Sequence, residues 1–155
     1  MNESMDEAIG FAKKYIEDLL SFFGLNTDVY ATSDDEVIQL SVPSTHLNGF
    51  LIGVGGENMR SFQYLTSTAL KNNNYTNSRV NVDIADYKRQ RADRLREKAG
   101  DWVEQVRSSK KPLQLEPMNA ADRRIVHQLA AEHGLKSESM GVGRDRHIVL
   151  EYVKE

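Results

Sequence analysis

The chain has 155 residues, no cysteine and a formal net charge of −3 at pH 7. The absence of cysteine excludes disulfides, thiolate metal sites and a cysteine nucleophile, and 39% hydrophobic with 28% charged residues is typical of a folded chain. No run approaches the roughly 20 apolar residues of a membrane span, and the N-terminus is acidic where a signal peptide would be basic. We therefore expect a cytoplasmic protein without membrane insertion, built as one domain or two small ones.

The charge is distributed unevenly along the chain. Residues 1–77 hold 4 Lys and Arg against 10 Asp and Glu, a net of −6, whereas residues 78–155 hold 16 against 13, a net of +3. Nine of those 16 cations lie between Lys88 and Lys111. This asymmetry indicates two modules, of which the second is better suited to a polyanion. A long solvated helix face that is rich in arginine is the alternative explanation.

The first half of the chain predicts elements in the order αββααβ. Apolar residues recur at helical spacing from Met5 to Phe23, and Gly24 predicts the end of that helix. Two strand-like runs, residues 25–32 and 36–42, are separated by Ser33-Asp34-Asp35 and predict a hairpin. We expect Ser44 to cap a short helix that the glycines after Ile52 interrupt.

A second helix is predicted to open at Glu57, and a strand is predicted over residues 79–84. The residues that we expect this helix to turn inward are Phe62, Leu65, Thr66, Ala69 and Leu70. A polar loop over residues 71–78 separates the two elements.

The second half predicts the order αβαββ. A helix over residues 86–107, with an apolar stripe that includes Ala92, Leu95 and Trp102, is expected to join the two modules. After a break at residues 108–112, Leu113 and Leu115 flank a short strand. The next helix has Asn119 as its expected N-cap and Gly134 as its expected stop. Two strands over residues 135–140 and 147–153 complete an α+β fold of two small α/β sandwiches.

The glycine-rich segment Gly53-Val54-Gly55-Gly56 lies between the two short-range helix signals. Glycines at this spacing let a backbone approach a phosphate, and the following helix directs N–H groups and its positive dipole end toward the anion. Four residues are a weak signal, and a tight turn between helices is the alternative. A P-loop is excluded because no Gly-Lys-Ser/Thr follows, and a dinucleotide fingerprint because the third glycine is missing.

Two further groups of residues carry candidate binding chemistry. Arg123 and His127 lie four positions apart and are expected to project together into solvent, where a guanidinium can hold a phosphate and an imidazole can donate or stack. The segment Arg144-Asp145-Arg146-His147, with Ser137 and Ser139 nearby in sequence, offers cations and hydroxyls to phosphates. A surface coincidence and an ordinary polar hairpin turn are the respective alternatives.

Catalytic arrangements are poorly supported by the sequence. The histidines, His46, His127, His133 and His147, share no metal-ligand spacing. No serine lies in a nucleophile elbow. We therefore expect no metal, no cofactor and no enzymatic activity.

Two blocks of the chain resemble a known family. Residues 50–57 (FLIGVGGE) and 62–65 (FQYL) resemble the KH domain of the bacterial Jag family, also called KhpB or EloR, the SpoIIIJ-associated proteins. The resemblance continues through residues 79–83 and Tyr87-Lys88. Residues 115–119 (LEPMN) with 123–127 (RRIVH) are similar to the family's Arg-x-x-x-His (R-3-H) domain, and Ser137–Gly141 is similar to its continuation. Two independent motifs occur in the family's order and cover nearly the whole chain.

This resemblance implies a type II KH domain over residues 1–86 and an R-3-H domain over residues 87–155 that includes the long helix 86–107. It implies binding of single-stranded RNA, with single-stranded DNA as a second ligand, in post-transcriptional control linked to cell elongation and envelope growth. It also implies a homodimer, or a heterodimer with a small KH-domain protein. The expected contact residues are Arg123, Arg124, His127, Ser139, Arg144, Arg146, Gly53, Val54, Gly55 and Gly56.

The chain departs from the family pattern in two places. The family usually has basic residues inside the glycine loop where this chain has Val54 and Gly55, so we expect this loop to bind weakly beside an apolar groove that includes Ile52 and Val82. We also expect the family's separate N-terminal Jag domain and its linker to be missing. The alternative function is a protein-interaction scaffold that dimerises through the acidic KH half and has little nucleic-acid affinity of its own.

Overall fold

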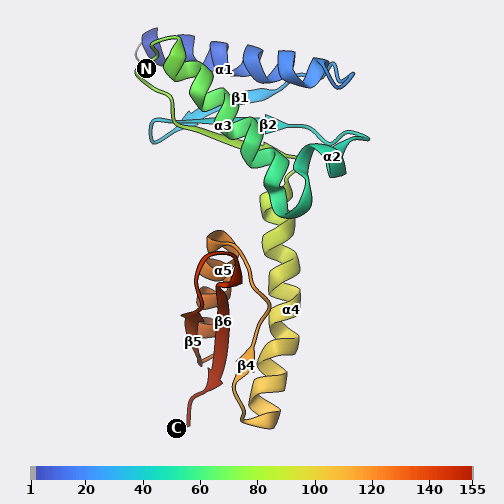
Figure 1. Cartoon of the computed structure of the whole chain (residues 1–155), viewed down its shortest axis with the longest axis vertical. Helices are drawn as coiled ribbons and strands as arrows, with labels where there is room; N and C mark the ends of the chain where they lie inside the picture. Colours follow the sequence, from blue (N-terminus) through green and yellow to red (C-terminus); the bar gives the residue numbers. More distant parts are fainter. Residues whose placement is uncertain (1–2, 155) are drawn as a thin grey trace. The chain divides into compact units, whose positions relative to one another are not determined.

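The computed structural model describes residues 3–154. Its contacts divide the chain into two compact units, Met1–Lys88 and Arg89–Glu155, here called the N-terminal and C-terminal units. This division lies two residues beyond the expected 86/87 boundary. The elements of both units are labelled in Figure 1. Helices and strands mix in both units, so the predicted α+β class is confirmed.

The N-terminal unit has the predicted order αββααβ. Its elements are α1 (Glu3–Ser21), β1 (Tyr30–Asp34), β2 (Val37–Val42), α2 (Asn48–Ile52), the 3-10 turn η1 (Val54–Gly56), α3 (Glu57–Asn72) and β3 (Val80–Ile84). The sheet has the order β1-β2-β3, in which β1 is antiparallel to β2 and β2 is parallel to β3. Helices α1 and α3 cover one face of this sheet (Figure 1).

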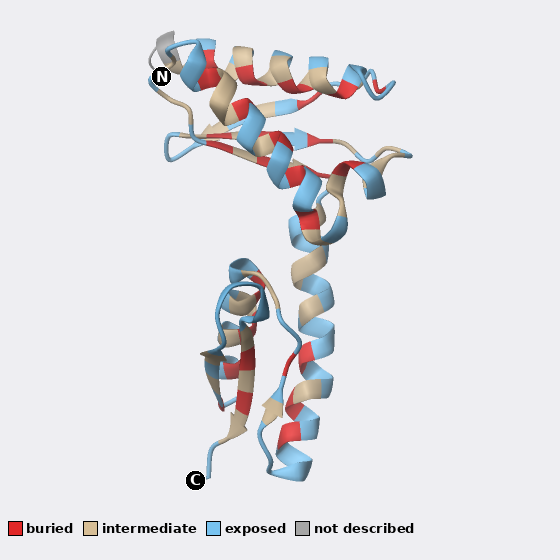
Figure 2. Cartoon of the chain, in the orientation of Figure 1, coloured by how far each residue is buried: buried red, intermediate tan, exposed pale blue. Residues whose placement is uncertain are grey.

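The core of the N-terminal unit lies between these helices and the sheet (Figure 2). Alternate residues of β2 and β3 are buried there because successive side chains of a strand point to opposite faces. They are Ile38, Leu40, Val42, Val80, Val82 and Ile84. The prediction that Val82 lines a groove is wrong, because this side chain has 0% exposure in the core.

The hairpin differs from its prediction in the position of the turn. Strand β1 begins at Tyr30 and continues through Asp34, so Ser33 and Asp34 pair with Ile38 and Val37. The turn consists of Asp35 and Glu36, with φ angles of 45° and 62°. Two consecutive positive φ angles match the right-handed twist of the flanking strands, and this favours a two-residue connection.

Two predictions about the helices that follow are also wrong. Ser44 is not the N-cap of α2, which begins at Asn48; the Asn48 side chain instead donates to Ser44 Oγ at 2.8 Å and accepts from the Thr45 N–H at 2.7 Å. Leu65 points outward and is 43% exposed. The buried line of α3 follows Phe62, Thr66 and Leu70 at four-residue spacing, and Leu65 lies about 100° around the helix from Thr66.

The C-terminal unit completes the predicted order αβαββ. Its elements are α4 (Tyr87–Ser109), which begins two residues before the boundary, β4 (Leu113–Gln114), α5 (Ala120–Glu132), β5 (Leu135–Met140), the 3-10 turn η2 (Gly143–Asp145) and β6 (His147–Tyr152). The sheet is antiparallel with the order β4-β6-β5. Within residues 3–154, no helix has the length and hydropathy needed to cross a membrane.

Helix α4 contributes to the second core only through its C-terminal half. Its buried residues are Ala99, Val103 and Val106, whereas Ala92 and Leu95 of the predicted stripe are only partly buried. Val103 and Val106 pack with residues of β4, α5, β5 and β6. Trp102, the single tryptophan of the chain, is partly buried against this core.

Candidate functional site

Helix α5 begins and ends where the sequence predicts. Asn119 has extended backbone geometry, and its Oδ1 accepts a hydrogen bond from the Asp122 N–H at 2.9 Å, which is the bonding of an N-cap. Gly134, with φ of +68°, follows the last residues of the helix. A left-handed glycine after a helix is a common terminator. The first turn of α5, which carries Arg123, is therefore held at a defined position.

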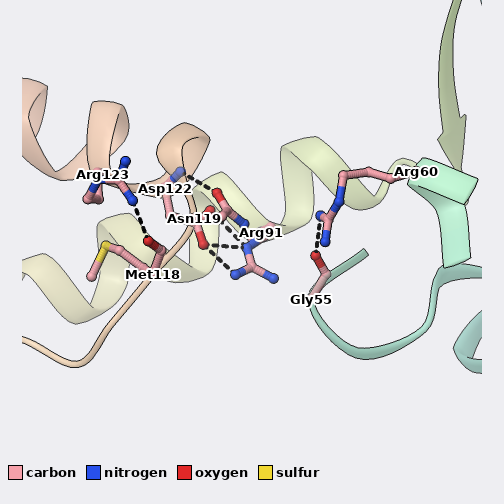
Figure 3. Close-up of polar contacts among 7 residues, drawn as sticks. All are labelled: Gly55, Arg60, Arg91, Met118, Asn119, Asp122 and Arg123. Atoms are coloured by element: carbon pink, nitrogen blue, oxygen red, sulfur yellow. Dashed lines mark hydrogen bonds and ion pairs between the residues drawn. The ribbon is translucent and has the colours of Figure 1, made fainter. Parts of the chain in front are cut away.

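An ion pair within the C-terminal unit holds the same turn. Asp122 is 3% exposed, and Arg91 of α4 donates through Nε to Oδ1 at 2.8 Å and to Oδ2 at 2.9 Å (Figure 3). The Arg91 Nη2 group also bonds to Oδ2. Neither residue has a role among the sequence-based predictions, because a charge pair between positions 31 apart leaves no pattern in the sequence.

Arg123 and Arg146, two predicted contact residues, meet at the backbone of Met118. Arg123 Nη1 donates to the Met118 carbonyl at 2.7 Å (Figure 3), and the Met118 N–H donates to the Arg146 carbonyl at 3.1 Å. Arg146 Nε in turn donates to Ser139 Oγ at 3.0 Å. The fold therefore connects Arg123, Ser139 and Arg146, which are far apart in sequence, in one group of side chains that we call the arginine cluster.

His127 lies one helical turn after Arg123 and shares a hydrogen bond of 2.7 Å between its Nδ1 and Ser137 Oγ. Residues four apart on a helix rise by about 6 Å, and residues two apart on a strand rise by about 6.6 Å. Arg123 and His127 on α5 thus match the spacing of Ser139 and Ser137 on β5. The prediction that the Arg123–His127 pair projects freely into solvent is wrong, because both side chains are half-buried and bonded within the protein.

Other cations of the C-terminal unit remain exposed near this cluster in the chain. Arg124 follows Arg123 on α5, and Arg144 lies in the η2 turn between β5 and β6. The turn requires glycine at position 141, where φ is +83° and an added Cβ would lie 2.8 Å from the Asp145 carbonyl oxygen. His147 has structural partners, since its Nδ1 lies 2.8 Å from the Asp145 carbonyl oxygen and its Nε2 lies 3.0 Å from Gln114 Nε2.

The glycine loop belongs to the N-terminal unit. Gly53, Gly55 and Gly56 have φ angles of 71°, 60° and 80°, and Val54 between them is 90% exposed. Asn58 Nδ2 donates to the Phe50 carbonyl at 2.7 Å and so links the first turn of α3 to α2. The loop therefore presents backbone and one apolar side chain at its surface.

Arg60 is a cation at this loop that the sequence-based predictions missed. It extends from the first turns of α3, and its Nη1 donates to the Gly55 carbonyl at 2.9 Å (Figure 3). The prediction of a loop poor in cations considered only the positions inside the four-residue motif. The helical position after the motif was the signal that could have revealed Arg60.

Comparison with known proteins agrees with this division of the chain. Residues 93–152 match the R-3-H domain family. The RNA-binding protein KhpB of Bacillus subtilis (strain 168) is 29% identical over 144 residues, which cover 91% of this chain and 69% of that protein. RNA-binding protein KhpB of Clostridium symbiosum is 26% identical over 97% of this chain and 67% of its own length, and that of Lactiplantibacillus plantarum is 26% identical over 88% and 42%. The chain thus contains an R-3-H domain and is similar along nearly all of its length to proteins of the KhpB type.

Proposed function

We propose that this chain binds single-stranded RNA and that the arginine cluster of the C-terminal unit is the main phosphate-binding surface. The observation that carries the proposal is the meeting of Arg123 and Arg146 at the backbone of Met118. The R-3-H match spans both arginines, and the similar KhpB proteins are named as RNA-binding. Single-stranded DNA is the second ligand that the same chemistry accepts.

The bonds within the cluster leave it able to bind a phosphate. The contact of Arg123 with Met118 uses one of several guanidinium N–H donors, and arginine matches the geometry of phosphate oxygens. Arg124, Arg144 and Arg146 are cations of the same unit. Contacts to phosphates position a strand without reading its sequence, so the His127 ring is the group of this surface that is suited to a base.

In this proposal residues 1–86 form a type II KH domain and residues 87–155 form the R-3-H domain with its long helix. The order αββααβ, the parallel pairing of β2 with β3 and the position of the glycine loop between α2 and α3 support the first assignment. The protein acts in the cytoplasm without catalysis, as a post-transcriptional regulator linked to cell elongation and envelope growth. It pairs with a second copy or with a small KH-domain protein.

Fluorescence anisotropy with a labelled single-stranded RNA of about a dozen nucleotides tests the proposal. Arg123→Ala is expected to weaken binding and to lower the slope of log affinity against log salt by about 0.7, the value for one phosphate contact on a single strand. Arg96→Ala, which removes an exposed cation of α4, is the matched control. Equal affinity and equal slope for Arg123→Ala and the wild type would refute the role of Arg123.

A protein-interaction scaffold is the second candidate function. It is favoured by exposed apolar side chains of the acidic N-terminal unit, among them Phe22, Phe50 and Val54. Size-exclusion chromatography with light scattering over a range of concentrations distinguishes the two candidates. A tight dimer that binds no RNA at low salt would support the scaffold and contradict the RNA-binding proposal.

A further inference from the structure

The outward face of α3 carries an aromatic ring beside an arginine. Arg60 and Tyr64 are four residues apart, so they are neighbours on the helix surface. Tyr64 is 71% exposed, and Leu65 beside it is 43% exposed. None of these three residues was predicted to bind a ligand.

Two hollows adjoin this face, and Arg60 and Tyr64 line both of them. The first has a volume of about 370 Å³ and is lined by Arg60, Gln63, Tyr64 and Ser67 of α3 with Arg79 and Val80 at the start of β3. The second has a volume of about 530 Å³ and lies over Glu57, Arg60, Ser61, Tyr64 and Leu65. The Tyr64 ring thus separates two open depressions, each of which contains at least one guanidinium.

The arginines of this surface extend from backbone that the fold holds in place. The Arg79 carbonyl accepts from the Ile38 N–H at 2.8 Å, and Ser67 Oγ donates to the neighbouring Ser78 carbonyl at 2.7 Å. Arg60 bonds to the Gly55 carbonyl of the glycine loop (Figure 3). The surface therefore extends from the glycine loop along α3 to the beginning of β3.

The charge of this surface opposes that of the half in which it lies. Residues 1–77 contain only 4 Lys and Arg against 10 Asp and Glu, yet Arg60 lies here together with Arg79. Glu57 is the one carboxylate among the lining residues of the two hollows. Guanidinium groups on either side of an exposed aromatic ring suit a single-stranded nucleic acid, whose bases stack on the ring while its phosphates bind the cations.

We propose that Arg60, Tyr64 and Arg79 form a second binding surface for single-stranded RNA, in which Tyr64 stacks on a base and the two arginines bind the adjacent phosphates. Arg60 supplies at the glycine loop the positive charge that Val54 and Gly55 do not. This inference rests on the proposed RNA-binding function and extends it to the N-terminal unit. The N-terminal unit then contributes affinity of its own.

Variants of the full chain test this surface by anisotropy with the same labelled RNA. Tyr64→Ala is expected to weaken binding by about tenfold, the usual effect of losing one base stack, with an unchanged salt slope. Tyr64→Phe keeps the ring and is expected to bind within about twofold of the wild type. Arg60→Ala and Arg79→Ala are each expected to weaken binding and to lower the salt slope by about 0.7.

The N-terminal unit offers matched controls for both kinds of change. Tyr30 on β1 is 70% exposed, so Tyr30→Ala removes an equally exposed tyrosine. Lys71→Ala removes an exposed cation from the last turn of α3. Circular dichroism of every variant is expected to match that of the wild type, because none of the substituted side chains is buried.

The outcomes separate this inference from the proposed function. If Tyr64→Ala and Arg60→Ala bind like the controls while Arg123→Ala binds weakly, the α3 surface is refuted and the arginine cluster stands. If Tyr64→Ala changes the mass of the protein in solution but not its affinity for RNA, the surface binds a protein and the inference is overturned. If the wild-type chain binds no RNA, the proposed function fails and this inference fails with it.

Discussion

Arg91 of α4 and Asp122 of α5 form an ion pair in which the Arg91 Nε lies within 2.9 Å of both carboxylate oxygens. Asp122 is the only buried charged residue in the described part of the chain, whereas the Arg91 side chain keeps 30% of its exposure. The two partners therefore differ in what each would leave behind. Loss of Arg91 leaves a carboxylate in the protein interior, and loss of Asp122 leaves a guanidinium that water can reach.

Arg91→Ala is accordingly expected to lower the free energy of unfolding of the C-terminal unit by about 3 kcal/mol, and by more than Asp122→Ala does. Urea titration followed by the fluorescence of Trp102 measures this, since Trp102 packs against the core of that unit. Arg96→Ala, which removes an exposed cation on the same helix, is expected to change stability by less than about 0.5 kcal/mol. A larger loss for Asp122→Ala than for Arg91→Ala would contradict the assignment of the buried partner.

The Asn119 cap predicts a smaller effect on the same unit. Asn119→Ala removes the acceptor of the Asp122 N–H and is expected to cost about 1 kcal/mol in the same urea titration. Asn119→Asp and Asn119→Ser keep an oxygen at that position and are expected to stay near the wild type. Equal stability of the Ala and Asp variants would show that the side chain does not cap α5.

The glycine loop predicts opposite effects for two glycines of the N-terminal unit. Gly53 has φ of 71° and ψ of 179°, a region that is essentially restricted to glycine, and an added Cβ would lie 2.8 Å from Asn58 Cγ. Gly53→Ala is therefore expected to cost about 2 kcal/mol. Gly49 in α2 has nothing within 4 Å of an added Cβ, so Gly49→Ala is expected to be neutral or to stabilise by up to about 1 kcal/mol.

Hydrogen–deuterium exchange of peptides that cover residues 48–62 measures both changes within the N-terminal unit. Faster exchange is expected for Gly53→Ala, and equal or slower exchange for Gly49→Ala. Equal protection in the two variants would mean that Gly53 tolerates a side chain and that the loop geometry is not specific to glycine.

The contact between His127 and Ser137 predicts a change in affinity without a change in salt dependence. Ser137→Ala removes the partner of His127 Nδ1, so the ring loses an orienting hydrogen bond. RNA binding is expected to weaken by about threefold, which is typical of one neutral hydrogen bond, at an unchanged salt slope because no charge is lost. Ser108→Ala, at an exposed position of α4, is the control. Unchanged affinity in Ser137→Ala would show that binding does not require the orientation of His127.

Much of the fold is predictable from local patterns in this sequence. The element orders αββααβ and αβαββ follow from apolar spacing, which reports the helical and strand periods over a few residues. Asn119 and Gly134 mark the ends of α5 because capping depends on residues next to each other in the chain. The hairpin turn was misplaced by its polar composition, since Ser33 and Asp34 are typical turn residues but pair as strand.

The candidate site was predicted only in part. Arg123, Ser139 and Arg146 were chosen as separate contacts, and their connection through Met118 was not foreseen. Arg60 was missed because its bond to Gly55 joins a helix to the loop before it. The placement of Leu65 on the inner side of α3 was wrong because an apolar residue at the margin of a helical stripe can face either way.

Composition, periodicity and short motifs were thus sufficient for the α+β class, the order of the elements and the choice of Arg123 and His127, because each depends on residues that are close along the chain. The buried pair of Arg91 and Asp122, the half-burial of His127 against Ser137 and the hollows beside Tyr64 depend on which surfaces pack together. Packing joins residues through their distances in space, and a one-dimensional pattern does not contain those distances.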